Sequence, residues 1–305
     1  MSHPLNYCYP FPSPNAPHFK SILREFLDWG VNSFVFTVEL AEECATKPES
    51  AELLRKLCKE FGVTFTSMHS PCGRAYDMNI PETEDRAAML DMHRKAMTLA
   101  AEFGSKTYTI HVGAYHYVHQ HITVAASRPL AKETLEKLLP LAEKLGIVIA
   151  VENSFEPPNC PDEVLAIVKD YLGSPSTGVC FDTGHANIMS PYPWKKRENY
   201  EDYMPVCWWE TGVIEEPAAL EKLSPHVVTC HIHDNSGYGD HHSMPFDGCI
   251  QWDQLMPKLF ACPRMLEYQT EVCFDYGTNR AGKLPAPVGG YSIKRYVETF
   301  RKLGF

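Results

Sequence analysis

The 305-residue sequence lacks the segments that direct a chain to or through a membrane. Its opening residues, MSHPLNYCYPFPSPN, contain no cationic start followed by an apolar run, so no signal peptide is expected. No stretch approaches the roughly 18 consecutive apolar residues that a membrane-spanning helix needs. These absences predict a protein of the cytoplasm with no membrane partner.

Paired cysteines and an excess of positive charge are also absent. The 11 cysteines are scattered singly without a CxxC pair, and Cys180 and Cys230 lie inside apolar runs. Reduced thiols are therefore expected rather than a disulfide framework. The formal net charge is −10. Because a protein that binds nucleic acid normally carries a basic surface, this balance argues against a nucleic-acid partner.

The sequence does contain an alternation of short apolar runs and longer amphipathic segments. Continuous apolar strands are typical of a parallel sheet that is buried on both faces. About eight strand–helix units in 305 residues predict an α/β fold, a single (β/α)8 TIM barrel domain over residues 1–305. The alternative is a doubly wound open sheet, but no strand is followed by a GxGxxG or P-loop motif. Seven strand candidates cover residues 5–9, 31–38, 63–68, 106–110, 147–151, 177–181 and 265–272, and another begins at Val227 and leads to His231.

One segment interrupts the alternation. Residues 187–216 follow the sixth strand candidate and are rich in proline, tryptophan and tyrosine. This composition predicts a long loop insertion, and long loops in compact domains usually have a function. The aromatic residues of the insertion could also form an interface between copies of the chain, as in a homo-oligomer.

Residue types that bind metals or transfer protons end successive strand candidates. In a barrel, the carboxyl ends of the strands converge on one face, where the active site is built. A single histidine at a strand end usually has a structural role, but a series of such residues predicts a shared site. The series consists of Glu39, His69, His111, Glu152, Asp182, His231 and Glu271.

Some of these signals are stronger than others. Glu152 ends a run of five apolar residues, and a buried carboxylate costs several kcal/mol unless it is paired or bound to a metal. Asp182 and His185 are three residues apart at a strand-to-turn corner, a spacing that lets both face one centre. Carboxylates and imidazoles without thiolates predict a divalent ion, with Zn²⁺ or Mn²⁺ favoured.

A second group follows the seventh strand candidate. His231 and His233 have the same parity and can both point into the barrel, where His233 is expected to hydrogen-bond rather than to bind metal. Asp240 and His242 form an i, i+2 pair that can grip one ion, with His241 between them pointing away.

These residues resemble the xylose isomerase-like TIM barrels, a family that includes sugar isomerases and epimerases and the endonuclease IV type of AP endonuclease. The similarity runs from His69 to Glu271. Its most specific pieces are VENS at Glu152, FDTGH from Asp182, and HIHDNSGYGDHH from His231. One departure is Pro245–Gly248, where the family more often has a Gly-Glu-Gly turn, and this puts the role of Asp247 in doubt.

The resemblance implies specific metal ligands. In the sugar epimerases of the family, two Glu, one Asp and one His hold one divalent metal, and the matching positions are Glu152, Asp182, His231 and Glu271. In the AP endonucleases a trinuclear zinc site has further ligands, and the matching positions are His69, His111, His185, Asp240 and His242. One ion is favoured here, although the donors would suffice for up to three.

Two functions follow as hypotheses. The first is a metal-dependent isomerase or epimerase of a small sugar or related hydroxy-carbonyl compound, acting through an enediolate-like intermediate. Glu152 and Glu271 would remove and return the proton, while His185 and His233 would hydrogen-bond substrate hydroxyls. Trp208, Trp209 and Phe11 could supply an apolar wall for the sugar.

The second hypothesis is zinc-dependent phosphodiester hydrolysis at abasic DNA. The acidic charge balance argues against it, because contacts to phosphates need lysine and arginine. A non-catalytic sugar-binding relative would be expected to lose a metal carboxylate. Glu152, Asp182 and Glu271 are all present, so this third reading ranks last.

Overall fold

Eight parallel strands form the centre of the computed structural model, which describes residues 3–274 and 291–305. Strands that follow one another in the chain pair along the sheet from β2 to β8, and β8 also pairs with β1. Tyr7, just beyond β1, forms a parallel bridge with Phe34 of β2 and closes the ring. The barrel prediction is confirmed, and the open-sheet alternative is wrong. The strands are β1 Leu5–Asn6, β2 Ser33–Phe36, β3 Thr64–His69, β4 Thr107–His111, β5 Val148–Glu152, β6 Thr177–Asp182, β7 Val227–Ile232 and β8 Tyr268–Thr270.

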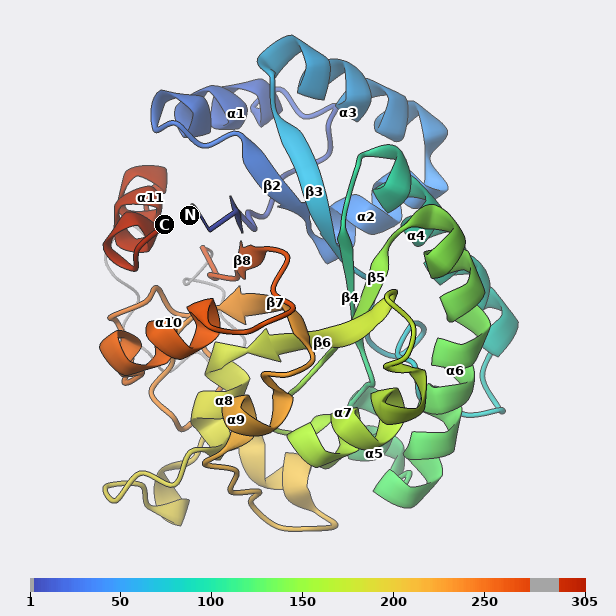
Figure 1. The fold of residues 1–305 in the computed structure, drawn as a ribbon, viewed down its shortest axis with the longest axis vertical. Helices are drawn as coiled ribbons and strands as arrows, with labels where there is room; N and C mark the ends of the chain where they lie inside the picture. The colour runs from blue at the N-terminus through green and yellow to red at the C-terminus, as the bar shows by residue number, and fades with distance from the viewer. Residues whose placement is uncertain (1–2, 275–290) are drawn as a thin grey trace.

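Helices surround the barrel on its outside (Figure 1). Within the described residues, no helix is both long and apolar enough to cross a bilayer. The helices are α1 Phe19–Asp28, α2 Val38–Thr46, α3 Pro48–Phe61, α4 Arg86–Glu102, α5 Tyr115–Gln120, α6 Val124–Leu145, α7 Pro161–Val168, α8 Thr183–Met189, α9 Ala219–Leu223, α10 Trp252–Phe260 and α11 Ile293–Lys302. Short 3-10 turns are η1 Pro157–Asn159, η2 Lys169–Tyr171, η3 Arg197–Asn199 and η4 Met204–Trp208.

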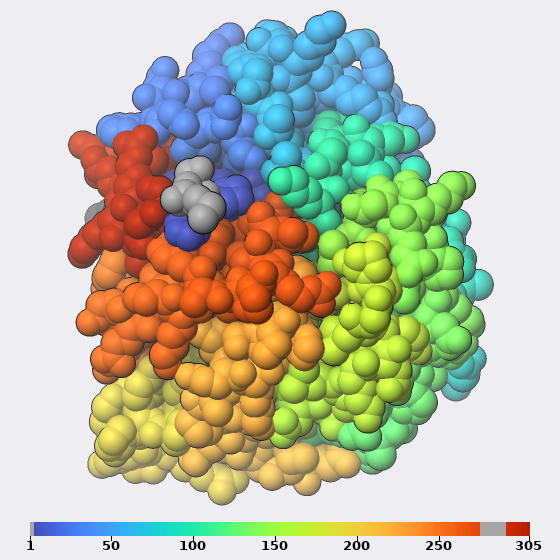
Figure 2. Space-filling view, in the orientation of Figure 1, coloured from blue at the N-terminus to red at the C-terminus, as the bar shows by residue number. Residues whose placement is uncertain are grey.

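The two ends of the described chain meet at the surface. His3 stacks on Phe260 at the end of α10, with ring centroids 3.8 Å apart, and Phe305 contacts the same ring at 5.4 Å. In the space-filling view, blue N-terminal residues therefore lie beside orange α10 and red α11 (Figure 2). This aromatic contact holds α10 and the C-terminal residues beyond α11 against the start of the chain.

Three sequence-based expectations need correction. The strand predicted over residues 31–38 ends at Phe36, because Thr37 is already the N-cap of α2, and Glu39 lies in the first turn of that helix. The predicted insertion 187–216 begins three residues later, since residues 187–189 complete α8. The remaining segment, 190–218, carries η3 and η4 and lies next to α8 and α9, yellow to orange in Figure 1.

The interior of the barrel contains a polar network around Glu267, which precedes β8. Glu267 is 2% exposed, and its Oε2 accepts a hydrogen bond of 2.8 Å from Asn6 Nδ2. Its other oxygen accepts a hydrogen bond from Thr107 of β4, so one carboxyl group links β1 with the opposite side of the barrel. Burial raises the pKa of Glu267 from its ordinary value of 4.5 to about 7.

Replacing this carboxyl should change how stability depends on pH. The folded state binds the proton of Glu267 more tightly than the unfolded chain, so wild-type stability falls as pH rises from about 4.5 to 7, by roughly 3 kcal/mol in total. The Glu267→Gln variant should lack this component and be the more stable protein at pH 8. Urea unfolding at pH 5 and pH 8 measures both values, with the exposed Glu49→Gln variant as control. The same pH dependence in wild type and Glu267→Gln would contradict the assignment.

Candidate active site

A cavity of about 630 Å³ opens at the carboxyl ends of the barrel strands. Side chains from β3, β4 and β5 and from the segment after β8 line it. This is the face on which βα loops build the active sites of TIM barrels. The predicted site residues that line this cavity are Glu39, His69, His111, Glu152, His185, Asp240, His242 and Glu271.

Four predicted metal ligands form a central set. Glu152 and Asp182 end neighbouring strands β5 and β6, and the parallel register places His231 of β7 directly beside Asp182. His231 Nδ1 lies 3.2 Å from Glu152 Oε1 and 2.8 Å from Glu271 Oε2. One donor atom from each of Glu152, Asp182, His231 and Glu271 lies within 4.8 Å of the other three.

A second set shares Glu152 with the first. His111 ends β4 and is the register partner of Glu152, and its Nε2 lies 3.0 Å from Glu152 Oε2. His69 ends β3, and its Nε2 lies 4.0 Å from the same Glu152 oxygen and 3.9 Å from Glu271 Oε1. The carboxylate of Glu152 therefore faces two groups of histidines.

An outer set lies beyond Asp182. Asp182 caps α8 by accepting a 2.6 Å hydrogen bond from the backbone N–H of His185, which fixes His185 beside the barrel mouth. His185 Nε2 lies 3.5 Å from Asp240 Oδ2, and His242 Nε2 lies 3.2 Å from Asp240 Oδ1. Donor atoms of His185, His233, Asp240 and His242 lie within 4.8 Å of one another.

The loop that carries Asp240 and His242 folds around Asp234. The carboxylate of Asp234 accepts hydrogen bonds from the backbone of Phe246 and Ile250, both 3.1 Å, and from Trp252 Nε1 at 2.8 Å. Gly248 passes so close that a Cβ atom there would lie 2.1 Å from Asp234 Oδ1. Only glycine fits at this approach, so Asp234 and Gly248 together determine the path of the loop.

Backbone carbonyls orient three of the site histidines. The Nδ1 atoms of His69, His185 and His242 lie 3.0, 3.0 and 3.2 Å from the carbonyl oxygens of Ser70, Asn153 and Glu271. A carbonyl can only accept, so each Nδ1 carries a proton and each Nε2 faces the carboxylates. Metal-binding histidines commonly have this outer hydrogen bond, which fixes the tautomer and the ring orientation.

His233 has a different environment from the other site histidines. It is fully buried, and its Nε2 lies 3.0 Å from both oxygens of Asp182. Its ring stacks on His242 with centroids 3.9 Å apart. His233 therefore makes a hydrogen bond, as expected, but its partner is Asp182. It does not line the described cavity, so the expected contact with substrate hydroxyls is not supported.

The electrostatics of the site favour a bound cation. Burial alone would lower the pKa of His231, but Cys180, Glu152 and Glu271 raise it well above its ordinary value. Burial likewise opposes protonation of His242, yet Asp240 and Glu271 raise its pKa to about 9. Clustered carboxylates thus attract positive charge strongly enough to overcome desolvation.

Crowded buried atoms mark where a cation would fit. His231 Nδ1, Glu271 Oε2 and Asp240 Oδ1 make no hydrogen bond of normal geometry within the described residues, although His231 Nδ1 lies 2.8 Å from Glu271 Oε2 and Asp240 Oδ1 lies 3.2 Å from His242 Nε2. Buried polar atoms normally form well-aligned hydrogen bonds, so these three atoms of the central and outer sets need an explanation. Together with the imidazole and carboxylate donor types, they fit Zn²⁺ or Mn²⁺ ligation.

The predicted aromatic wall is wrong. Phe11 packs in the core against Phe19 and Phe34, because its segment turns inward after β1. Trp208 donates its Nε1–H to the Phe155 carbonyl at 3.0 Å, and Trp209 donates to that of Tyr117, also at 3.0 Å. The described apolar part of the cavity wall instead contains Pro10, Val38, Ala114, Tyr115, Val272 and Phe274.

Sequence reasoning missed several polar residues of the cavity. Asp77 lies in the connection after β3, and burial raises its pKa to about 6. Glu156 enters the wall from the connection after β5. Neither residue ends a strand, so no positional signal distinguished them. Asp247, whose role was open, pairs with Arg295 of α11 at 2.5 Å and takes a structural part.

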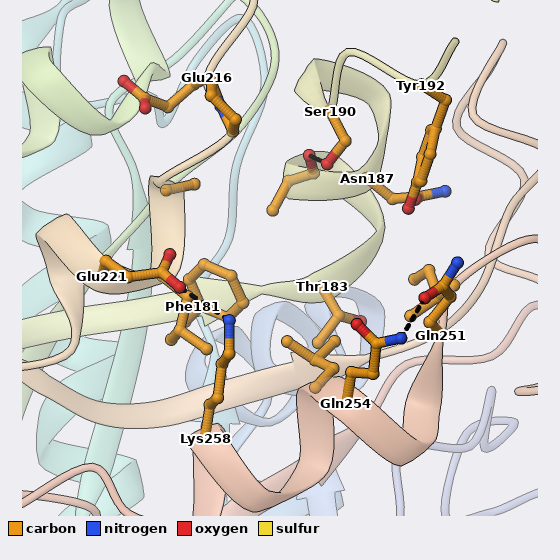
Figure 3. A pocket seen from close by; sticks show the side chains of 16 residues that line it. Phe181, Thr183, Asn187, Ser190, Tyr192, Glu216, Glu221, Gln251, Gln254 and Lys258 are labelled. Carbon is orange, nitrogen blue, oxygen red and sulfur yellow. Dashed lines mark hydrogen bonds and ion pairs between the residues drawn. The ribbon is translucent and has the colours of Figure 1, made fainter. Parts of the chain in front are cut away.

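A second cavity, of about 270 Å³, lies on the outer side of β6 among α8, α9 and α10 (Figure 3). Its polar side chains already have partners. Lys258 pairs with Glu221 at 2.8 Å, and Tyr192 donates a hydrogen bond of 2.7 Å to Asn187. The larger cavity at the barrel mouth, with its clustered histidines and carboxylates, is therefore the candidate active site.

Comparisons with known proteins agree on the fold. The uncharacterised protein MJ1311 of Methanocaldococcus jannaschii is 26% identical over 223 residues, which make up 70% of this chain and 65% of that protein. This chain thus spans just under two thirds of that relative's length.

Two solved structures have similar folds. D-psicose 3-epimerase with D-tagatose from Clostridium cellulolyticum has a TM-score of 0.72 and 13% identity, with 99% of this chain and 98% of that chain covered. A xylose isomerase-like TIM barrel protein from Mycobacterium smegmatis in complex with magnesium has a TM-score of 0.64 and 16% identity, with 99% and 95% covered. At such identities the likeness shows the fold alone.

The family model of the xylose isomerase-like TIM barrels matches residues 23–283, most of the chain. The closed eight-stranded barrel and the donor residues at its strand ends agree with this match. This chain therefore belongs to the xylose isomerase-like TIM barrel family.

Proposed function

We propose that this protein is a divalent-metal-dependent isomerase or epimerase of a small sugar or a related hydroxy-carbonyl compound. One observation carries the proposal. Glu152 and Glu271 come from different sides of the barrel, both line the cavity, and both approach His69 and His231. A substrate carbon between them would have a carboxylate on either face.

Two facing carboxylates support proton transfer at such a carbon. One can remove the proton next to the substrate carbonyl, and the other can return it on the opposite face, which inverts the centre. A positioned general base is worth about 10²- to 10⁴-fold in rate. Backbone carbonyls orient His69 and His185. The Nε2 atoms of these two rings would form hydrogen bonds with the hydroxyl groups of the substrate.

The central set of Glu152, Asp182, His231 and Glu271 would hold the ion, with Zn²⁺ or Mn²⁺ favoured. When bound, the ion would polarise the carbonyl and stabilise the negative charge of an enediolate-like intermediate. The related structures named for a sugar epimerase and for a magnesium complex support this reading.

The charge of the cavity favours a sugar over nucleic acid. The described lining contains six carboxylates, those of Glu39, Asp77, Glu152, Glu156, Asp240 and Glu271, and no lysine or arginine. A DNA backbone is bound mainly through cationic side chains. Carboxylates instead accept hydrogen bonds from hydroxyl groups, which a sugar supplies in number.

A second candidate is phosphodiester hydrolysis at abasic DNA. The observation that favours it is the number of donor sets: His69, His111 and Glu152, the central set, and His185, Asp240 and His242 can each surround an ion. Clustered ions can activate water and stabilise a leaving oxygen. The described lining supplies no cationic side chain for the flanking phosphates, so this function ranks second.

Activity assays can separate the two functions. Protein loaded with Mn²⁺ or Zn²⁺ should exchange solvent deuterium into a ketose from a panel of free sugars and should not nick duplex DNA at an abasic site. Mass spectrometry and gel electrophoresis provide the measurements. Nicking without exchange into any sugar would refute the proposed function and favour the second candidate.

The Glu152→Gln variant should lose at least about 10²-fold in turnover, because it removes the proposed base and one ligand oxygen charge. Glu267→Gln is the matched control, since Glu267 is equally buried but lies in the barrel interior away from the cavity. The control should retain wild-type turnover. Undiminished turnover in Glu152→Gln would mean that another residue serves as the base.

Metal removal should destabilise the protein. Without an ion, only the neighbouring histidines offset the charges of Glu152, Asp182 and Glu271, and an ion at 100 times its Kd adds about 2.7 kcal/mol of stability. Treatment with a chelator should lower Tm by several degrees, and Zn²⁺ or Mn²⁺ should restore it. The Asp182→Asn variant should show a smaller shift. An unchanged Tm, with no metal bound per chain, would exclude an ion from the central set.

A further inference from the structure

The segment between α8 and α9, residues 190–218, forms hydrogen bonds with the loop that carries Asp240 and His242. The hydroxyl of Tyr203 accepts a hydrogen bond of 2.7 Å from the backbone N–H of Asp240. Glu201 Oε1 lies 3.0 Å from His241 Nε2, where His241 is buried and Glu201 is partly buried. The backbone N–H of Glu201 also donates to the Tyr238 carbonyl at 3.1 Å. Three contacts thus join Glu201 and Tyr203 of the segment to residues 238, 240 and 241 of the loop.

A second contact of His241 shows which of its ring nitrogens carries the proton. The backbone N–H of Ser236 donates to His241 Nδ1 at 3.3 Å, so Nδ1 is the accepting nitrogen. Nε2 therefore carries the proton and donates a hydrogen bond to the Glu201 carboxylate. A charged acceptor strengthens this hydrogen bond relative to a neutral one. His241 is not a donor of the outer set, but it lines the cavity beside Asp240 and His242 rather than pointing away as expected. Its contact with Glu201 ties the middle of the loop to the segment.

The loop needs such support because its backbone is strained. His242 has a φ of +48°, in the left-handed region that side chains other than glycine's adopt at a cost of roughly 1 kcal/mol. On its other side, His242 is held by the segment after β8, where the backbone N–H of Cys273 donates to the His242 carbonyl at 2.8 Å. The contacts of Glu201 and Tyr203 complete the support on the side of Asp240.

The segment between α8 and α9 is also bound to α8, the helix that carries His185. Lys195 Nζ donates to the carbonyls of Asn187, Ile188 and Ser190 at 3.0, 2.8 and 2.8 Å, at the end of α8. The segment and α8 also share an apolar cluster of Phe155, Ile188, Met189, Met204, Cys207 and Trp208. The connection therefore runs from His185 through α8 and the segment to Asp240.

We propose that Glu201 and Tyr203 are positioning residues that hold Asp240 and His242 against His185. They act through the loop at residues 238–241. They thereby fix the positions of the outer-set side chains before a ligand binds. The inference rests on the proposed function for what the outer set binds, and it gives the insertion after β6 a role in that function. Tyr203 and Glu201 do not themselves line the described cavity.

Hydrogen exchange in chelator-treated protein tests the positioning without any substrate. In Tyr203→Phe and Glu201→Ala, amides of residues 236–243 should exchange at least about tenfold faster than in wild type, while β5 and β7 stay protected. Glu201→Gln keeps an oxygen acceptor for His241 and should restore most of the protection. Glu198→Ala, an exposed change in the same segment, should behave as wild type. Unchanged exchange at residues 236–243 would overturn the proposal.

Kinetics then test the functional consequence. For a sugar that the wild type turns over, Tyr203→Phe and Glu201→Ala should raise KM about fivefold or more and change kcat less than about twofold, because Glu152 and Glu271 stay in place. Faster exchange without any rise in KM would show a purely structural contact and would also overturn the proposal. Absence of sugar turnover in the wild type would instead count against the proposed function, and the exchange comparison would still decide the positioning.

Discussion

The carboxylate of Glu152 is the interaction on which the site depends. It ends a buried strand, and its oxygens lie 3.0 Å from His111, 3.2 Å from His231 and 3.5 Å from His185. Burial by itself would raise the pKa of Glu152, yet His231 and His111 hold it well below its usual range. An anion so deeply buried is stable only with positive charge beside it, whether from protons on histidines or from an ion. The neighbouring strands supply the histidines that meet this requirement.

A frame of hydrogen bonds around the donors determines what they can do. Carbonyls of Ser70, Asn153 and Glu271 orient three histidines, while Asp234 gathers the loop behind the outer set. Groups held in place in this way need little rearrangement when a ligand binds. Such preorganisation is the main source of electrostatic stabilisation in enzymes. The segment after α8 contacts this frame from outside the barrel through Glu201 and Tyr203, which bind the loop of Asp240 without lining the described cavity.

The character of the cavity, rather than its donors, separates the two functions considered. The same donor sets could serve sugar chemistry or phosphodiester hydrolysis, because both use divalent ions held by carboxylates and imidazoles. The rest of the described wall differs from what a polyanion needs, since Glu39, Asp77 and Glu156 add further acidic side chains to the lining. Neutral hydroxyl groups match these acceptors.

The sequence by itself determined the barrel and the donors at its strand ends. Apolar runs with a polar residue at each end are a local pattern, and a closed parallel barrel brings such ends together whatever the helices outside do. The pattern therefore located Glu152, Asp182, His231 and Glu271. Glu39 lies in the first turn of α2 rather than at a strand end, because Thr37 caps that helix, yet it still lines the cavity.

Only the tertiary structure decided which side chains lie within contact distance of one another and what surrounds them. The inward position of Phe11, the burial of Asp77 and the pairing of Glu201 with His241 join residues far apart in the chain, and no local periodicity records such contacts. Loop paths depend on close approaches such as that of Gly248 to Asp234, which exist only once the barrel has closed.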